Sequence, residues 1–176
     1  MRGGKVVSNS GPLIALAKLN QLSVLKRLFQ QLLIPQAVYE EAVIRGMTQG
    51  YPDALAIKLF LEQQGWRTIY VDHHGINKDL LKEKLDWGEI ESIQLAMDVK
   101  DALLFIDDEE ARGVARKQGL GTKGTVGVLV EAFQKRLIDL EEIELLFAQI
   151  QARDDIWISP ALCKEVLSKL KAREFN

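Results

Sequence analysis

Short apolar segments alternate with amphipathic helical patterns along the chain, and this alternation constrains the fold more than any other feature of the sequence. The segments are brief and β-branched or continuously apolar, whereas the patterns between them repeat apolar residues three or four positions apart. The five expected strands are Lys5–Val7, Leu32–Ile34, Trp66–Val71, Ala102–Ile106 and Leu120–Thr122. Strands and helices in turn predict a three-layer α/β fold, with a parallel sheet of about five strands and helices on both faces.

One hydrophobic core is enough for a chain of 176 residues, of which 47% are hydrophobic. A second domain would need a core of its own, and no repeat, low-complexity stretch or linker divides the sequence. We therefore predict a single domain over residues 1–176, with its motif-bearing core at about residues 5–135. Two further amphipathic helices are expected over about residues 140–173, and Ser159-Pro160 is a good start signal for the second.

Charge and cysteine content indicate the cellular compartment of the protein and the kinds of partner it binds. The chain has 23 Lys and Arg against 25 Asp and Glu, so no global positive field attracts nucleic acid and any such site must be local. A single cysteine, Cys163, excludes an internal disulfide and a paired-cysteine metal site. No apolar stretch approaches the roughly 20 residues of a membrane span, and the opening apolar run is too short for a signal peptide. We expect a soluble, cytoplasmic protein with no membrane partner.

Polar side chains directly follow three of the expected strands. Asn9 and Ser10 come after the first strand, Asp107 and Asp108 after the fourth, and Thr125 after the fifth. Ligands of an open parallel sheet bind beyond the carboxyl ends of its strands, where loops and helix N-termini converge. These residues are therefore the first candidates for a functional site.

Two helices add carboxylates to the same edge. Glu89 lies in the opening turn of its helix, and Glu40 and Glu41 lie one turn into theirs, although either of the latter two is also read as a plain solvated charge. Carboxylates brought together repel one another unless a hard divalent cation neutralises them, and Mg²⁺ favours a few carboxylates with several waters. Such a crevice predicts a metal whose remaining ligands come from phosphate.

Helix capping is the competing explanation for each of these residues taken singly. Asp86 with Glu89 and Asp107 with Glu110 both have the spacing of a capping box, in which the side chains satisfy free helix-end amides. Asn9 or Ser10 would cap the first helix in the same way, and Thr125 the helix after the fifth strand. What favours a site is the placement of all of them on one edge of one sheet.

Five blocks of sequence carry a resemblance to a known family. They read VVSNSGPLIAL at residues 6–16, IPQAVYEE at 34–41, GEIESIQLA at 88–96, LFIDD at 104–108 and GTVGVL at 124–129. In these blocks and in this order the chain resembles the PIN domain, and in particular the VapC-related nucleases whose opening reads VVSxSxPLIAL. The resemblance implies a PIN-like fold and a hydrolase, an endoribonuclease that uses Mg²⁺ or Mn²⁺ to cut phosphodiester bonds of RNA.

The same resemblance implies roles for individual residues and partners. The family's catalytic acids and hydroxyl fall on Glu41, Glu89, Asp107 and Thr125. The implied metal ligands are Asn9, Glu41, Glu89, Asp107 and Asp108. Glu40 is a weaker candidate than Glu41, because the family's acid usually falls three residues after the valine, here Val38. Such proteins are often toxins of toxin–antitoxin pairs and commonly form dimers, so a small antitoxin and a homodimer are expected.

Asn9 departs from the family pattern, which has its first acid at this position. An amide oxygen still ligates a hard cation but brings no charge, so it should bind Mg²⁺ more weakly. The alternative function is a catalytically weakened or inactive PIN-fold module that binds nucleic acid or protein. A phospho-receiver domain is a third reading, because Asp107-Asp108, Lys123 and Thr125 resemble its pattern, but that class needs an acidic pair after the first strand.

Four basic residues downstream of the fourth strand are the expected phosphate contacts, with the solvated face of one helix as the competing explanation: Arg112, Arg116, Lys117 and Lys123. His73-His74 is not expected to form a zinc site, because adjacent histidines do not easily face one ion and no third histidine exists. Glu91, about 200° around the helix from Glu89, is expected to be solvated. The three tryptophans are expected in the core or at an interface rather than as stacking platforms for bases: Trp66, Trp87 and Trp157.

Overall fold

The computed structural model describes residues 3–174 and divides into two compact units. The first unit ends at Thr125 and the second begins at Val126, and each is described by itself. The sheet and all the residues of the candidate site belong to the first unit. The single domain over residues 1–176 stays a prediction.

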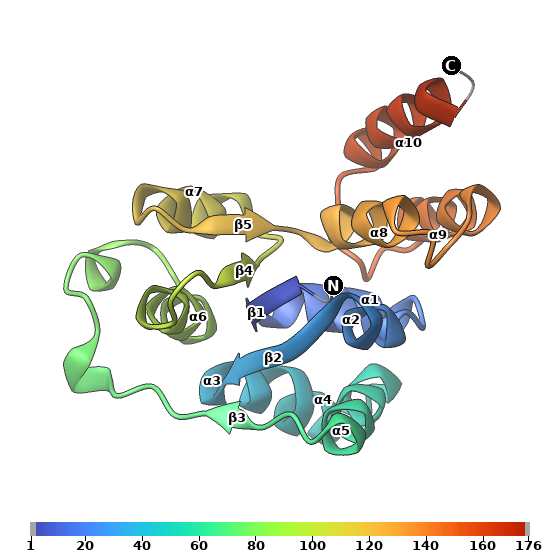
Figure 1. The fold of residues 1–176 in the computed structure, drawn as a ribbon. Coiled ribbons are helices and arrows are strands. Elements are labelled where there is room, and N and C mark those ends of the chain that lie inside the picture. The colour runs from blue at the N-terminus through green and yellow to red at the C-terminus, as the bar shows by residue number, and fades with distance from the viewer. Residues whose placement is uncertain (1–2, 175–176) are drawn as a thin grey trace. The chain divides into compact units, whose positions relative to one another are not determined.

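All five expected strands form, and they make one parallel sheet (Figure 1). Their bounds are β1 Gly3–Ser8, β2 Phe29–Pro35, β3 Thr68–Ile69, β4 Leu103–Phe105 and β5 Gly121–Lys123. The spatial order is β3-β2-β1-β4-β5, so the chain winds outward from β1 in one direction and then outward from β4 in the other. The switch point of the sheet therefore lies between β1 and β4, where open α/β sheets form their binding crevice.

The helices of the first unit follow the sequence patterns closely. Their bounds are α1 Ser10–Lys18, α2 Leu22–Leu28, α3 Gln36–Tyr39, α4 Gly46–Thr48, α5 Pro52–Gln64, α6 Trp87–Asp98 and α7 Glu109–Lys117. A π-helical segment, η1 Glu40–Arg45, joins α3 to α4, and two 3₁₀ turns, η2 His73–Gly75 and η3 Leu80–Lys82, precede α6. Helix α5 starts at Pro52 and ends at Gly65, whose left-handed φ of 64° favours glycine.

Successive strand residues face opposite layers, as a pleated strand requires. Val7, Leu33 and Leu104 join the buried side chains of α6 and α7 in one cluster. Phe105, the next residue after Leu104, packs edge-to-face on Phe29 with ring centroids 5.2 Å apart. Helix α6 contacts β1, β2 and β4, whereas α2 contacts β2 and α1 contacts α5. The predicted three-layer α/β architecture is confirmed, with helices on both sides of the strands (Figure 1).

The second unit is helical and holds the two predicted C-terminal helices. Helix α8 Thr125–Gln134 crosses the boundary, and α9 Leu140–Ala152 and α10 Pro160–Glu174 follow. Asp139 caps α9 by accepting a hydrogen bond from the Glu142 amide at 2.8 Å, and Lys171 of α10 pairs with Glu144 of α9 at 2.6 Å. Cys163 is buried in this unit. Among residues 3–174, no helix is long and apolar enough to cross a membrane.

Candidate active site

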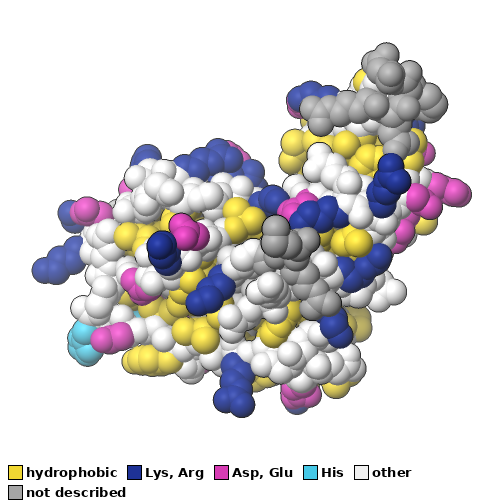
Figure 2. Space-filling view, in the orientation of Figure 1, with side chains coloured by type: hydrophobic (Ala, Val, Ile, Leu, Met, Phe, Trp, Pro, Cys, Tyr) yellow, Lys and Arg dark blue, Asp and Glu magenta, His cyan; other side chains and the backbone are white. Residues whose placement is uncertain are grey.

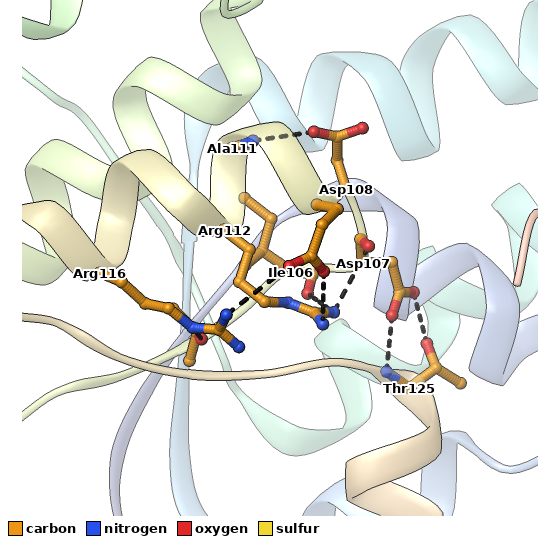
Figure 3. A network of polar contacts seen from close by, with 9 residues as sticks. Ile106, Asp107, Asp108, Ala111, Arg112, Arg116 and Thr125 are labelled. Carbon is orange, nitrogen blue, oxygen red and sulfur yellow. Dashed lines mark hydrogen bonds and ion pairs between the residues drawn. The ribbon is translucent and has the colours of Figure 1, made fainter. Parts of the chain in front are cut away.

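Asp107 and Thr125 form a close pair at the carboxyl ends of β4 and β5 (Figure 3). The Thr125 backbone N–H donates to Asp107 Oδ1 at 2.7 Å, and the Thr125 hydroxyl donates to Asp107 Oδ2 at 2.6 Å. Burial raises the pKa of the Asp107 carboxyl above its usual 3.8, although the two Thr125 hydrogen bonds and the nearby Arg112 charge lower it. The pair spans 18 positions of sequence and holds one carboxylate in a defined orientation.

Glycines let the backbone approach this carboxylate. A Cβ atom on Gly124 would lie 2.7 Å from both Asp107 Oδ1 and Arg112 Nη2, so a side chain there would displace the pair. A Cβ atom on Gly11 would lie 3.6 Å from the Asp107 Cβ, which places the first turn of α1 against the same residue. These contacts give a physical reason for the glycines in two of the sequence blocks.

Arg112 lies under the loop that carries Asp107. Its Nη2 donates to the Ile106 carbonyl at 2.9 Å and to the Asp107 carbonyl at 3.4 Å, and its Nη1 pairs with Glu109 at 3.1 Å (Figure 3). The side chain is only 18% exposed. Arg112 therefore holds the loop in place and presents little of its guanidinium group to a phosphate.

The other predicted phosphate contacts lie further out. Arg116 donates to the Thr122 hydroxyl at 3.3 Å and pairs with Glu109 at 3.6 Å, Lys117 is exposed, and Lys123 lies at the end of β5. Lys and Arg side chains on the face drawn in Figure 2 are spread among acidic ones rather than gathered in one patch. Phosphate binding by these four residues stays a prediction, and the geometry favours it least for Arg112.

Asp108, rather than Asp107, caps helix α7. Its side chain accepts a hydrogen bond from the Ala111 backbone N–H at 2.8 Å, so the predicted capping box of Asp107 with Glu110 is wrong by one residue. The physical reason is that both Asp107 oxygens already accept hydrogen bonds from Thr125. Capping therefore does not account for Asp107.

Glu89 both caps a helix and belongs to an acidic crevice. Asp86 accepts from the Glu89 amide at 2.8 Å and Glu89 Oε2 accepts from the Asp86 amide at 2.9 Å, which confirms the predicted capping box. Burial, together with the negative charges of Asp86, Asp108 and Glu41, raises the pKa of Glu89 to about 7, against the lowering effect of the Asp86 hydrogen bond. Glu41 belongs to η1 and Asp108 is the N-cap of α7, so Glu89 lies within electrostatic reach of carboxylates from two other segments.

Glu41 approaches the same helix start from the π-helical segment η1. A Cβ atom on Gly88 would lie 3.2 Å from Glu41 Oε2, so the glycine leaves room for the carboxylate. Burial raises the pKa of Glu41, a Ser10 hydrogen bond lowers it, the Asp86 charge raises it and the Arg45 charge lowers it. A π-helical turn shifts side chains relative to an α-helix and is common at functional sites.

Glu40, the residue before Glu41, makes a different contact. Glu40 is exposed, and its Oε1 accepts a hydrogen bond from Gln36 Nε2 at 3.0 Å on the same helical segment. The geometry therefore favours Glu41 over Glu40 as the acid of this segment.

Asn9 uses its carbonyl oxygen to cap α1. Asn9 Oδ1 accepts from the Gly11 backbone N–H at 3.3 Å and from the Ser10 hydroxyl at 3.0 Å. Its Nδ2 atom is buried and has no hydrogen-bond partner among the described residues. Because the acceptor oxygen is engaged, the group that Asn9 leaves unsatisfied is a donor, and a donor does not bind a cation.

The donor chemistry of the crevice fits a hard divalent cation. Glu41, Glu89 and Asp107 carry hard oxygen ligands, and burial raises the pKa of all three despite the Arg45 charge near Glu41 and the Arg112 charge near Asp107. Within residues 3–174, no three His, Cys, Asp or Glu side chains are grouped closely enough to hold a metal ion. Asp107 is held instead by Thr125, and Glu89 by the Asp86 amide.

Sequence reasoning missed the opposite side of the α6 N-terminus. Glu91 is only 4% exposed, so the expectation that it is solvated is wrong. Its Oε1 lies 2.7 Å from His73 Nε2, and its Oε2 accepts from the Ala37 amide at 2.9 Å. The physical reason is that α3 packs on this face of α6. A sequence analysis that follows one apolar stripe along a helix does not predict a second buried face.

The tryptophans were expected in the core or at an interface. Trp87 is 52% exposed and Trp157 is 92% exposed, so neither belongs to the core and a place at an interface stays a prediction, whereas Trp66 packs edge-to-face on Phe60. The Trp87 ring stacks on the His73 ring with centroids 4.7 Å apart and planes 11° apart. The signal in the sequence was an aromatic residue directly after a capping aspartate, where helices usually carry polar side chains.

Comparison with known families identifies one match. Residues 5–172 match the sequence profile of the PIN domain. This range includes all five sequence blocks and most of each compact unit. No curated protein matches the chain significantly.

Proposed function

The chain belongs to the PIN-domain family, and from this premise we propose that it is a cytoplasmic, metal-dependent endoribonuclease that hydrolyses RNA phosphodiester bonds. PIN domains have a nuclease-type fold and are generally hydrolases. The observation that carries the proposal is the placement of Asp107 directly after β4, beside the β1/β4 switch point, with both of its oxygens held by Thr125. Burial raises the pKa of Asp107, Glu41 and Glu89, which supports the proposal.

In this proposal Glu41, Glu89 and Asp107 hold Mg²⁺ or Mn²⁺, with Asp108 as an auxiliary acid. The bound cation would lower the pKa of a water molecule and offset the charge of the phosphate. Thr125 orients Asp107 through both of its oxygens, and Arg112 supports the loop beneath it.

Glu89 Oε1 is the oxygen of this carboxyl that is open to the cation. Glu89 Oε2 accepts the Asp86 amide, so Oε1 remains for a ligand. With a pKa of about 7, the metal-free carboxyl has to give up its proton before it ligates a cation. Its ionised fraction, and with it the activity, should rise as the pH rises through 7.

A weakened PIN-fold module that binds RNA without efficient cleavage is the second candidate. The observation that favours it is Asn9, whose oxygen caps α1 and whose unsatisfied Nδ2 is a donor. A carboxylate at this position would supply a second oxygen where Asn9 supplies an N–H group. The two candidates differ in whether the folded wild-type protein cuts RNA.

We extend the proposal to a homodimer and to a small antitoxin partner. Large apolar side chains stay exposed in the second unit, and an interface there would bury them. They are Leu145, Trp157 and Leu162, at 58%, 92% and 40% exposure. Light scattering at low and high concentration tests the dimer, and a monomer at every concentration would contradict it.

Cleavage of labelled single-stranded RNA tests the proposed activity. The purified protein is assayed with Mg²⁺, Mn²⁺ or EDTA beside an Asp107→Asn variant. The matched control is Asp139→Asn, because Asp139 caps α9 in the second unit and asparagine caps a helix equally well. Metal-dependent cutting by the wild type and the control, but not by Asp107→Asn, is the expected result. No cutting by a folded wild-type protein with either metal would favour the second candidate.

A further inference from the structure

A cavity opens beside the acidic crevice and shares Glu41 with it. Its volume is about 650 Å³, enough for a nucleotide. Side chains from α3, η1, the segment after β3 and the start of α6 line it, among them Gln36, Glu41, Arg45, Tyr70, His73 and Trp87. Trp87 and Gly88, the first two residues of α6, line the cavity and directly precede Glu89 in the chain. A group bound here would lie next to Glu41, one of the proposed metal ligands.

Three aromatic rings line this cavity and remain accessible. The His73 and Trp87 rings stack at 4.7 Å, and their exposures are 51% for the His73 side chain and 52% for Trp87. Tyr70 is 74% exposed. Exposed aromatic rings that lie parallel at the mouth of a cavity are a surface on which a flat nucleobase extends the stack.

The stack is held rigid from beneath. Glu91, which is nearly fully buried, binds His73 Nε2 through one oxygen and the Ala37 amide through the other. The imidazole is therefore fixed in one plane, and Trp87 is fixed against it. A platform that is ordered before binding loses little conformational entropy when a base stacks on it.

The charges around the cavity select for a base rather than for a phosphate. Glu40, Glu41 and Asp86 all line it, so a phosphate inside would face several negative charges. The amino and imino N–H groups of a base, by contrast, donate to carboxylate oxygens. Arg45 is exposed and close enough to Glu41 to lower its pKa, which places one cation where a flanking phosphate would pass.

We propose that this cavity binds an unpaired nucleobase of single-stranded RNA, stacked on the Trp87–His73 pair next to the phosphate that is cut. The inference rests on the proposed function for the identity of the polymer, but not on catalysis. Only an unpaired base can leave its neighbours and enter a cavity of this kind, so duplex RNA is excluded from it.

Tryptophan fluorescence in EDTA tests base binding without cleavage. In a Trp66→Phe/Trp157→Phe protein, Trp87 is the sole tryptophan, and a single-stranded RNA hexamer is expected to quench it to saturation. The same hexamer made entirely of abasic nucleotides should not quench it. Equal quenching by the abasic hexamer would overturn the inference, because the cavity would then recognise the sugar-phosphate backbone.

Fluorescence anisotropy of a labelled hexamer gives the second readout. Trp87→Ala should raise the dissociation constant about tenfold, the range expected for loss of one stacked base, whereas Trp87→Phe keeps a ring and should stay within about threefold of the wild type. Tyr51→Ala is the matched control, because Tyr51 is an aromatic residue that is 54% exposed and does not line the cavity, and this variant should bind as the wild type does. Wild-type affinity in Trp87→Ala would overturn the inference.

The two proposals fail separately in these experiments. Base-dependent quenching of Trp87 by a protein that does not cut RNA contradicts the nuclease and supports the cavity. Metal-dependent cutting by a protein whose RNA affinity is unchanged in Trp87→Ala contradicts the cavity and supports the nuclease.

Discussion

Two carboxylates lie two residues apart on α6 and have opposite surroundings. Glu89 faces the crevice, where Asp86, Asp108 and Glu41 add negative charge and its pKa rises to about 7. Glu91 is buried more deeply but faces the cavity side, where His73 and the Ala37 amide occupy both of its oxygens. The difference teaches that uncompensated charge, rather than depth of burial, separates a carboxylate available for chemistry from one that organises structure.

The largest expected effect is on catalysis. Glu89→Gln should lower the rate of RNA cleavage at least about 100-fold, because a metal ligand is lost. Glutamine at this position still completes the capping box, so the folded structure should be kept. Initial rates with Mn²⁺, with circular dichroism to check folding, make the measurement. Wild-type rates in this variant would place Glu89 among the purely structural carboxylates.

The second expected effect is on stability and concerns Glu91. Glu91→Ala should lower the free energy of unfolding by about 2 kcal/mol, because the Ala37 amide loses its acceptor in a partly buried position. Glu83→Ala, at an exposed position, is the control and should change stability by no more than about 0.5 kcal/mol. Urea unfolding gives both values, and equal stability of the two variants would contradict the structural role.

The third prediction concerns a variant that adds one negative charge to the acidic crevice. Asn9→Asp should raise the affinity for Mn²⁺ about tenfold and increase cleavage, because a carboxylate replaces an N–H donor beside an existing set of acids. In EDTA the same variant should be less stable than the wild type, because the added charge is uncompensated. Lower Mn²⁺ affinity than the wild type would show that the position lies outside the metal site.

The smallest effect is a dependence of stability on pH. A carboxyl whose pKa is raised by folding holds its proton more tightly in the folded state, so its contribution is present below the unfolded value and is lost as the pH rises through the folded value. For Glu89 this window runs from 4.5 to about 7. Allowing for its partial exposure, metal-free protein should lose about 1 kcal/mol across the window.

Urea unfolding in EDTA at several pH values between 4.5 and 8 measures this loss. Glu89→Gln is the comparison, and its stability should fall less over the same range, with the remaining slope due to Glu41 and Asp107. Identical slopes in the two proteins would mean that Glu89 titrates near its usual pKa.

Much of the fold was predictable because its signals are local. Five apolar runs and the helical patterns between them were enough for the parallel sheet, and the strand ends then indicated Asn9, Asp107 and Thr125. The capping box of Asp86 with Glu89 depends on a spacing of three residues within one helix start, and it forms as predicted.

The features that were not predicted depend on distant contacts. Asp107 does not cap α7 because its oxygens are taken by Thr125, 18 residues later. Glu91 is buried because α3 covers a second face of α6, 54 residues after Ala37. The stack of His73 on Trp87 joins a 3₁₀ turn to a helix start, and no local periodicity indicates it. The cavity forms where α3 and η1, the segment after β3 and the start of α6 meet.

Calorimetric titration with Mn²⁺ tests the central claim most directly, because it asks whether Glu41, Glu89 and Asp107 hold a cation. Near pH 6.5, repeated in two buffers of different ionisation enthalpy, the wild type should bind saturably and release protons, since Glu89 with a pKa of about 7 is largely protonated before binding. Glu89→Gln should bind more weakly and release fewer protons. Absence of saturable binding, or binding with no proton release, would contradict the assignment of this crevice as the metal centre.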